Sequence, residues 1–301
     1  MSNCITIPSR SSVDMLRFRL LYHGEPGAAL EWFEKFCADV MIEYGRPDPK
    51  DPHRKLAERY PRSLRVGTYR EMLTLPTGDS SVTISMGRNG RGDKQELREG
   101  FLEFNPTKTY PSKQLEYVYH LLDMEPNVKL ELVRWDFATD YPIERASVAL
   151  MRDGRKYGCV ISDSYTSYLG RRSNNGFVKV YDKRAEQNKK GKAIKDPITR
   201  VEITIDEPAE TLEKLWARVV LLPESVPDRA KGLLRLVLLA TLNGVDLEEA
   251  LECVSRNKRA EYRNVIGEMC GEIAPPAEYA ACRRNALAWS HMYGGNGYAD
   301  R

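Results

Sequence analysis

The sequence predicts an α+β protein, with a largely antiparallel twisted sheet or sheets that carry helices on one face. Up to residue 207, several segments alternate apolar and polar residues at every second position, which is typical of strands. Short turn signals join consecutive segments, and short connections favour antiparallel pairing. After Pro208 the apolar residues recur at helical spacing. We therefore expect an α+β domain over residues 1–207 and an all-helical C-terminal part over 208–301.

The N-terminal third is expected to alternate strands with two helices. "SVDMLRFRLLY" from Ser12 reads as the first strand, and a helix follows over about 28–42. Several strands are expected within 64–105, and the last of them contains "GFLEFNPTK". Ser112 is a good N-cap for a helix that runs to about Met124.

The middle third is expected to be richer in strands. "LELVRWDFATDYP" reads as a strand that ends before Pro142, and a short helix is expected over 144–152. Four strands then follow, in "KYGCVISD", "SYTSYLG", "GFVKVYDK" and "ITRVEITID". The turn signal "NNG" at 174–176 predicts a hairpin between the second and third of them. The basic stretch "RAEQNKKGKAIK" is expected to be a flexible loop.

Positive charge is concentrated in one part of a chain whose net charge is only +3. Residues 151–200 contain 13 Lys and Arg against five Asp and Glu. Such a block suits a polyanion such as nucleic acid, and a solvated charged surface is the alternative.

The composition also predicts the compartment. None of the six cysteines lies in a CxxC pair or has a His at zinc spacing, which is typical of reduced thiols. "MSNCITIPSRSS" lacks the order of a signal peptide, and the apolar run from Leu233 is too short to span a bilayer. We expect a cytoplasmic protein.

Four of the expected strands have one polar and one apolar face, because side chains alternate along a strand. The apolar faces suit a helix-covered core. The polar faces contain Arg134, Asp136, Ala138 and Asp140; Lys179, Tyr181 and Lys183; Arg200, Glu202 and Thr204; and Glu103 with Asn105.

The acids on these faces suggest a metal site. Aspartate is depleted in strands, yet Asp136 and Asp140 flank a small Ala138. If these two converge with Glu202 and Glu103, the carboxylates repel one another unless a cation lies between them. Oxygen ligands of this kind select Mg²⁺ or Mn²⁺. The alternative is the ordinary solvated face of an antiparallel sheet.

Tyr181 is a candidate nucleophile. A phenol, with a pKa of about 10, is weakly nucleophilic at neutral pH. The lysines beside it, Lys179 and Lys183, favour the phenolate and can bind phosphates, and a metal ion would offset the charge of a phosphodiester. Attack on DNA would give a phosphotyrosine link and a free hydroxyl. The alternative is a half-buried strand tyrosine.

The segments "FLEFNPTK", "VRWDFATDYP", "SYLGRRSNNGFVKVYDKRAEQ" and "ITRVEITID" resemble, in order and spacing, the rolling-circle replication initiators of the Rep_trans family. This family includes staphylococcal-type plasmid initiators, phage initiators and related relaxases. The resemblance covers about residues 100–207. The chain departs from the family in having Lys179 where arginine is more common. The four histidines (His23, His53, His120 and His291) are scattered, so the chain has no His-hydrophobe-His motif.

The resemblance implies a metal-dependent nickase and ligase acting at a single-stranded or hairpin nick site in a DNA origin, with residues 1–207 as the catalytic domain. Tyr181 would be the nucleophile and Lys183 its catalytic neighbour. It also implies a homodimer and a host helicase as partner. The ligands expected for Mg²⁺ or Mn²⁺ are Asp136, Asp140, Glu202 and Glu103. The residues expected to bind DNA are Lys179, Arg171, Arg172, Arg200, Lys189 and Lys190.

Other functions fit the same sheet. A conjugative relaxase would use the same chemistry. A non-catalytic DNA-binding protein would bind DNA without cutting it. A metal nuclease that activates water would cut DNA but leave no protein attached.

Overall fold

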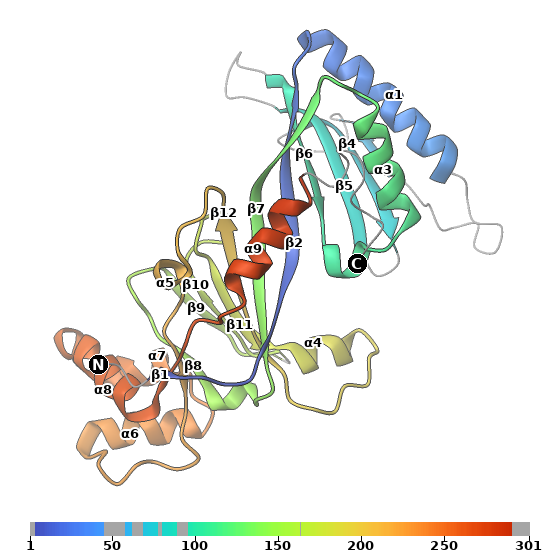
Figure 1. Cartoon of the computed structure of the whole chain (residues 1–301). Coiled ribbons are helices and arrows are strands. Elements are labelled where there is room, and N and C mark those ends of the chain that lie inside the picture. Colours follow the sequence, from blue (N-terminus) through green and yellow to red (C-terminus); the bar gives the residue numbers. More distant parts are fainter. Residues whose placement is uncertain are drawn as a thin grey trace. The chain divides into compact units, whose positions relative to one another are not determined.

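A computed structural model describes residues 4–44, 58–61, 69–77, 80–88, 96–162 and 164–290. It confirms the mixed α+β class, the largely antiparallel sheet and the helical character of the C-terminal part. The chain forms two compact units (Figure 1). Unit 1 consists of residues 1–12 and 137–279, and unit 2 of residues 13–136 and 280–301. The residues of these two units differ from the expected division of the chain at residue 207. The division into a catalytic domain and a helical C-terminal part remains a prediction.

Unit 2 is a sheet with two helices packed on one face (Figure 1). Its strands have the order β3-β4-β5-β6-β2-β7, and its helices α1 and α3 both contact the sheet. The expected N-cap of α3 is confirmed, because Ser112 Oγ accepts the backbone N–H of Leu115 at 3.1 Å. The bounds are β2 Arg10–Tyr22, α1 Pro26–Tyr44, β3 Glu58–Pro61, β4 Tyr69–Thr77, β5 Ser80–Arg88, β6 Glu96–Phe104, α2 Pro106–Thr109, α3 Lys113–Asp123, β7 Val128–Tyr141 and α9 Tyr279–Ala288.

The core of unit 2 follows from the alternation of its strands. On β2, Leu16, Phe18 and Leu20 are fully buried, while the arginines between them are not. Phe33 and Cys37 of α1 are also fully buried, one helical turn apart on the same face. The strand and helix periods in the sequence therefore specify this packing directly.

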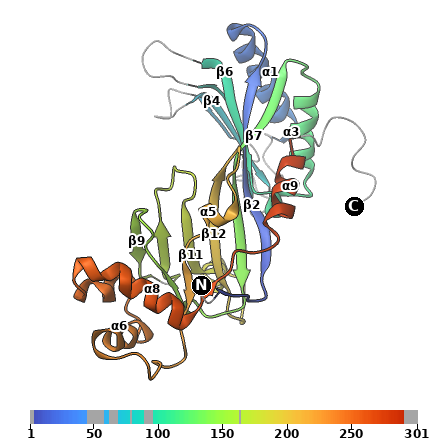
Figure 2. The same cartoon turned by 60° about the vertical axis from the view of Figure 1, so that its left-hand side comes forward.

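Unit 1 contains the sheet that carries the candidate site. Its strands have the order β7-β12-β11-β10-β9 (Figure 2), and the pairs β12–β11, β11–β10 and β10–β9 are antiparallel. The expected hairpin at 174–176 joins β10 to β11, with Gly176 at a φ of 73° that suits glycine. The bounds are β9 Tyr157–Val160, β10 Thr166–Leu169, β11 Val178–Asp182, α4 Lys183–Lys189 and β12 Thr199–Asp206.

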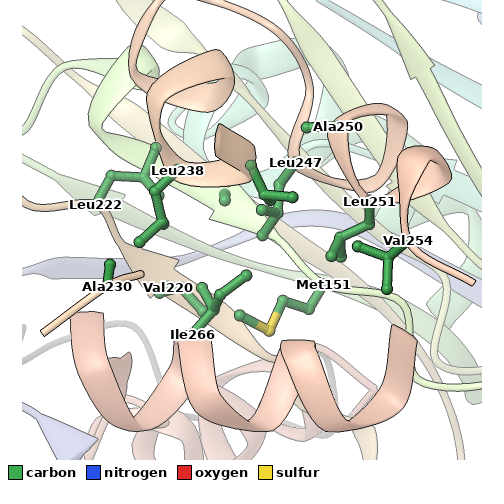
Figure 3. Packing of buried hydrophobic residues seen from close by; sticks show 12 residues of the cluster. Met151, Val220, Leu222, Ala230, Leu238, Leu247, Ala250, Leu251, Val254 and Ile266 are labelled. Atoms are coloured by element: carbon green, nitrogen blue, oxygen red, sulfur yellow. The ribbon is translucent and has the colours of Figure 1, made fainter. Parts of the chain in front are cut away.

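A second, four-stranded sheet of unit 1 has the order β1-β14-β13-β8 and packs against helices. Its buried side chains meet those of α6, α7 and α8; Figure 3 shows Met151, Val220 and Leu222 facing Leu238, Leu247 and Ile266. The bounds are β1 Cys4–Ile5, η2 Arg145–Ser147, β8 Val148–Leu150, α5 Leu212–Leu215, β13 Val219–Leu221, α6 Gly232–Leu242, α7 Leu247–Ala250, η3 Leu251–Cys253, η4 Arg256–Lys258, α8 Arg259–Cys270 and β14 Glu272–Ile273.

Three local predictions were wrong. Residues 144–152 form the short 3₁₀ turn η2 and strand β8, because 148–150 pair with β13 and become buried. The segment after Pro208 is helical but also contributes β13 and β14. The basic stretch after Tyr181 is not a loop throughout, since α4 occupies its first half.

Among the helices in the described ranges, none combines the length and the apolar character needed to cross a membrane.

Candidate functional site

Strands β11 and β12 bring four polar side chains to one face of the unit 1 sheet. Lys179 lies opposite Glu202, and Tyr181 lies opposite Arg200. Directly opposed residues of an antiparallel pair point to the same side, so all four share a face. The intervening residues, which point to the other face, are fully buried: Val178, Val180, Val201 and Ile203. The predicted division into an apolar and a polar face is therefore confirmed here.

Tyr181 is buried beneath charged side chains on this polar face. Only 3% of its surface is exposed. The Lys179 ammonium lies 4.1 Å from the centre of the phenol ring, and the Lys183 ammonium lies 5.6 Å from it. Such cation–π contacts stabilise the ring position and keep two positive charges beside it. Tyr181 is thus enclosed by cations, in contrast to an ordinary half-exposed strand tyrosine.

The Tyr181 hydroxyl forms hydrogen bonds with both a carboxylate and an ammonium group. It donates a hydrogen bond to Glu202 Oε2 at 3.3 Å and accepts one from Lys183 Nζ at 3.5 Å. Glu202 also lies 3.9 Å from the Lys179 ammonium. A carboxylate in this position can take the phenolic proton, and a neighbouring ammonium can stabilise the resulting phenolate. The arrangement can therefore convert Tyr181 into a nucleophile.

Helix α4 holds Lys183 in place. Asp182 caps the helix by accepting the backbone N–H of Ala185 at 2.8 Å, so the helix begins directly after Tyr181 and Asp182. One turn along, Glu186 Oε2 lies 2.5 Å from Lys183 Nζ, and Lys190 contacts the other oxygen of Glu186. Burial opposes ionisation, but the bonds from Lys183 and Lys190 prevail and lower the pKa of Glu186 to about 2. Glu186 thus remains a charged anchor for Lys183 at neutral pH.

Arg200 is engaged by Asp140. The guanidinium contacts both carboxylate oxygens, with Nε to Oδ1 at 2.6 Å and Nη2 to Oδ2 at 2.7 Å. Arg200 is buried with 7% of its surface exposed, and a forked pair of this kind is a strong and directional interaction. The pair joins β7 to β12 beside Tyr181, within unit 1.

The remaining predicted residues have varied positions. Lys189 and Lys190 are exposed at the end of α4, and Arg171 and Arg172 are exposed at the β10–β11 hairpin. All four lie on the surface of unit 1, and Lys190 also pairs with Glu186. Asp136 and Glu103 belong to unit 2, where Glu103 pairs with Arg17 at 2.5 Å.

The expected metal ligands do not form a preformed cage. Asp140 directs both oxygens at Arg200, and Glu202 receives the Tyr181 hydroxyl. Within the part of the chain that the structure describes, no group of three or more His, Cys, Asp or Glu side chains could hold a metal ion. Asp140 and Glu202 each have a partner within unit 1.

Two features of the site were missed in the sequence. Asp182 was not recognised as a helix cap, and Glu186 lies in the stretch that was expected to be a flexible loop. The signals were present: an Asp followed by helix-forming residues indicates an N-terminus, and Glu186 stands three residues after Lys183 and four before Lys190.

Comparisons with known proteins identify no family. No family model matches the chain, and no curated protein matches it. Among solved structures, the chain is similar to the "Rolling Circle Replication Initiator Protein from Geobacillus stearothermophilus". The alignment covers 88% of this chain and 98% of that chain, with 13% sequence identity and a TM-score of 0.35. Similarity at this level does not establish a shared fold or activity.

Proposed function

We propose that this protein nicks and rejoins one strand of DNA, with Tyr181 as the nucleophile, and that it thereby initiates rolling-circle replication. The observation that carries the proposal is the position of the Tyr181 hydroxyl, 3.3 Å from the Glu202 carboxylate and 3.5 Å from the Lys183 ammonium. A purely structural tyrosine would need one hydrogen-bond partner, whereas this one has a proton acceptor and a cation together. The resemblance of residues 100–207 to replication initiators supports the same reaction.

The proposed reaction exchanges one ester bond for another. Glu202 takes the proton from Tyr181 as the phenolic oxygen attacks phosphorus. A bond forms between that oxygen and phosphorus, and the bond between phosphorus and one deoxyribose oxygen breaks. The leaving oxygen takes a proton from solvent, which gives a DNA phosphotyrosine and a free hydroxyl. Rejoining is the reverse reaction, with the hydroxyl as nucleophile.

Basic residues around Tyr181 would bind the DNA backbone. Lys179 and Lys183 flank the phenol and are placed to contact the phosphate under attack. The exposed residues of the hairpin and of α4, Arg171, Arg172, Lys189 and Lys190, would contact neighbouring phosphates. Affinity should therefore fall steeply as salt rises.

We keep the requirement for Mg²⁺ or Mn²⁺ as part of the proposal. A bound divalent cation would offset the negative charge of the scissile phosphate. A ligand role for Glu103 predicts that Glu103→Gln raises the Mn²⁺ concentration needed for half-maximal nicking. An unchanged Mn²⁺ requirement would contradict the ligand role, and the ion pair with Arg17 would then be the only role assigned to Glu103. The same titration tests Asp136 and Asp140.

A single gel assay tests the central proposal. Supercoiled plasmid DNA and single-stranded oligonucleotides are incubated with the protein and Mn²⁺, and the products are separated with and without protease treatment. We expect nicked DNA that carries covalently attached protein, removable by protease. Tyr181→Phe should abolish both the nick and the adduct, because the ring remains but the nucleophilic oxygen is lost, while DNA affinity changes less than about threefold.

Other outcomes distinguish the alternatives. Nicked DNA without attached protein would indicate a nuclease that uses water. DNA binding with no product under any metal condition would indicate a non-catalytic DNA-binding protein. A covalent adduct that persists in Tyr181→Phe would contradict the assignment of the nucleophile. Tyr110→Phe, at an exposed tyrosine of unit 2, is the matched control.

A further inference from the structure

An aromatic pair lies on the same face as Tyr181 and has no role in the chemistry described so far. Tyr168 of β10 lies directly opposite Lys179 of β11, so both side chains point to the polar face. Phe177, two residues before Lys179, stacks against Tyr168 with ring centroids 6.0 Å apart and planes at 15°. Both rings are partly exposed, unlike the apolar residues on the other face of these strands.

Glycines leave space around this aromatic pair. On the β9 side, the residue opposite Tyr168 is Gly158, and a Cβ added there would meet nothing within 4 Å. At the hairpin, Gly170 comes close to Phe177, with 3.4 Å between a built Cβ and the Phe177 Cα. Because neither neighbour has a side chain, these two glycines do not cover the rings, and both rings keep part of their surface exposed.

The aromatic pair lies close to the nucleophile in the register of the strands. Lys179, opposite Tyr168, precedes Tyr181 by two residues, which is about 7 Å along a strand. The ammonium of Lys179 lies over the Tyr181 ring, 4.1 Å from the ring centre. A phosphate held at Tyr181 and Lys179 would therefore place an adjacent base near Tyr168. Aromatic surface beside a cation is the combination that binds single-stranded nucleic acid.

We propose that Tyr168 and Phe177 form a stacking platform for an unpaired base next to the scissile phosphate. This inference rests on the proposed function and adds a base-binding surface to it. The separation of 6.0 Å between the two rings leaves no room for a base between them, so the base stacks on their exposed surface. Every base has a flat aromatic face, so the platform contributes affinity without reading sequence.

A structural role for the pair makes a different prediction. Cross-strand aromatic pairs stabilise hairpins, and removal of one ring would then lower the unfolding midpoint without changing the way DNA is bound. The platform instead predicts that the two rings distinguish DNA with bases from DNA backbone without them. This distinction requires no knowledge of the natural origin sequence.

The experiment measures binding of two fluorescent probes of equal length, twelve-residue oligothymidine and an oligonucleotide of abasic sites. The full chain with Tyr181→Phe is used throughout, so that no covalent link forms. We expect oligothymidine to bind about tenfold more tightly than the abasic strand. Tyr168→Leu combined with Phe177→Leu should reduce this ratio to about two or less, by weakening the binding of oligothymidine alone.

Control variants separate the possible failures. Tyr168→Phe retains the ring and should keep the full preference for bases, while Tyr110→Leu removes an exposed aromatic ring from unit 2 and should also leave it unchanged. The proposal is contradicted if the double variant keeps the roughly tenfold preference for oligothymidine, including the case in which its affinity for both probes falls by the same factor. If no variant binds either probe, the proposed function fails as well. A melting curve for each variant confirms that it is folded.

Discussion

The two units have polar sheet faces with different properties. In unit 2, Arg17 pairs with Glu103 and Arg19 pairs with Glu131, with side chains between 26% and 48% exposed. These are ordinary surface ion pairs, which contribute little to stability. In unit 1 the corresponding face buries Tyr181, Lys183 and Arg200, each with at most 7% of its surface exposed. Burial of charge is costly, and its concentration around one phenol is the reason why this face is the candidate functional site.

The largest expected effect comes from the acid that contacts Tyr181. Glu202→Gln removes the proton acceptor but keeps the shape, and should lower the nicking rate by at least about 100-fold. Glu131→Gln makes the same change in the surface pair of unit 2 and should leave the rate within about twofold. Rates are measured from the formation of covalent adduct with time. Equal rates in the two variants would remove the distinction between the faces.

The next largest difference between the two faces should be in the stability that their ion pairs contribute. Arg200→Leu leaves the Asp140 carboxylate without its forked partner and should lower the free energy of unfolding by about 3 kcal/mol. Arg17→Leu breaks an exposed pair and should cost less than about 1 kcal/mol. Urea denaturation followed by circular dichroism measures both. A loss from Arg17→Leu as large as that from Arg200→Leu would contradict the comparison.

A smaller effect is expected at Lys183. Lys183→Met removes the ammonium that would stabilise the phenolate and should reduce nicking by about 10- to 100-fold. Lys190→Met removes the exposed partner of the same Glu186 and, at saturating DNA, should change the nicking rate by less than about threefold. The two variants therefore distinguish contact with Tyr181 from support of Glu186. Similar losses of nicking rate in both variants would indicate that Lys183 acts only by stabilising helix α4.

The smallest effect concerns pH. Because the pKa of Glu186 is lowered to about 2 in the folded chain, its stabilising contribution is complete above its ordinary pKa of 4.5 and is lost as pH falls toward 2. The melting temperature of the wild type should therefore fall more than that of Glu186→Gln between pH 5 and pH 3. Glu210→Gln, which breaks the exposed pair with Lys214, is the control and should behave like the wild type.

Much of this fold is predictable from the sequence. The alternation of Val178 and Val180 with Lys179 and Tyr181 specifies both faces of β11, and Ser112 specifies the start of α3. Residues 148–150 were not predictable as a strand, because pairing with β13 overrides the helix propensity of "ERASVALMR". Tertiary pairing of this kind leaves no local signal.

The site was predictable in part. The pattern placed Tyr181 and Glu202 on the polar faces of their own strands, and the structure brings the two residues into contact. It did not specify that Arg200 would engage Asp140, because the acids were considered only in relation to one another and a metal. The roles of Asp136, Asp140, Glu202 and Glu103 as ligands remain predictions.

The junction between β11 and α4 has a consequence for variation of this chain. Asp182 alone separates Tyr181 from Lys183; its side chain starts the helix, and its backbone N–H bonds to the Ser164 carbonyl at 2.9 Å. Each residue added to a helix turns the next by about 100°. One residue inserted here would swing the ammonium away from the phenol, even if every element stayed intact. The length of this linker should therefore tolerate less change than the identity of most residues around it.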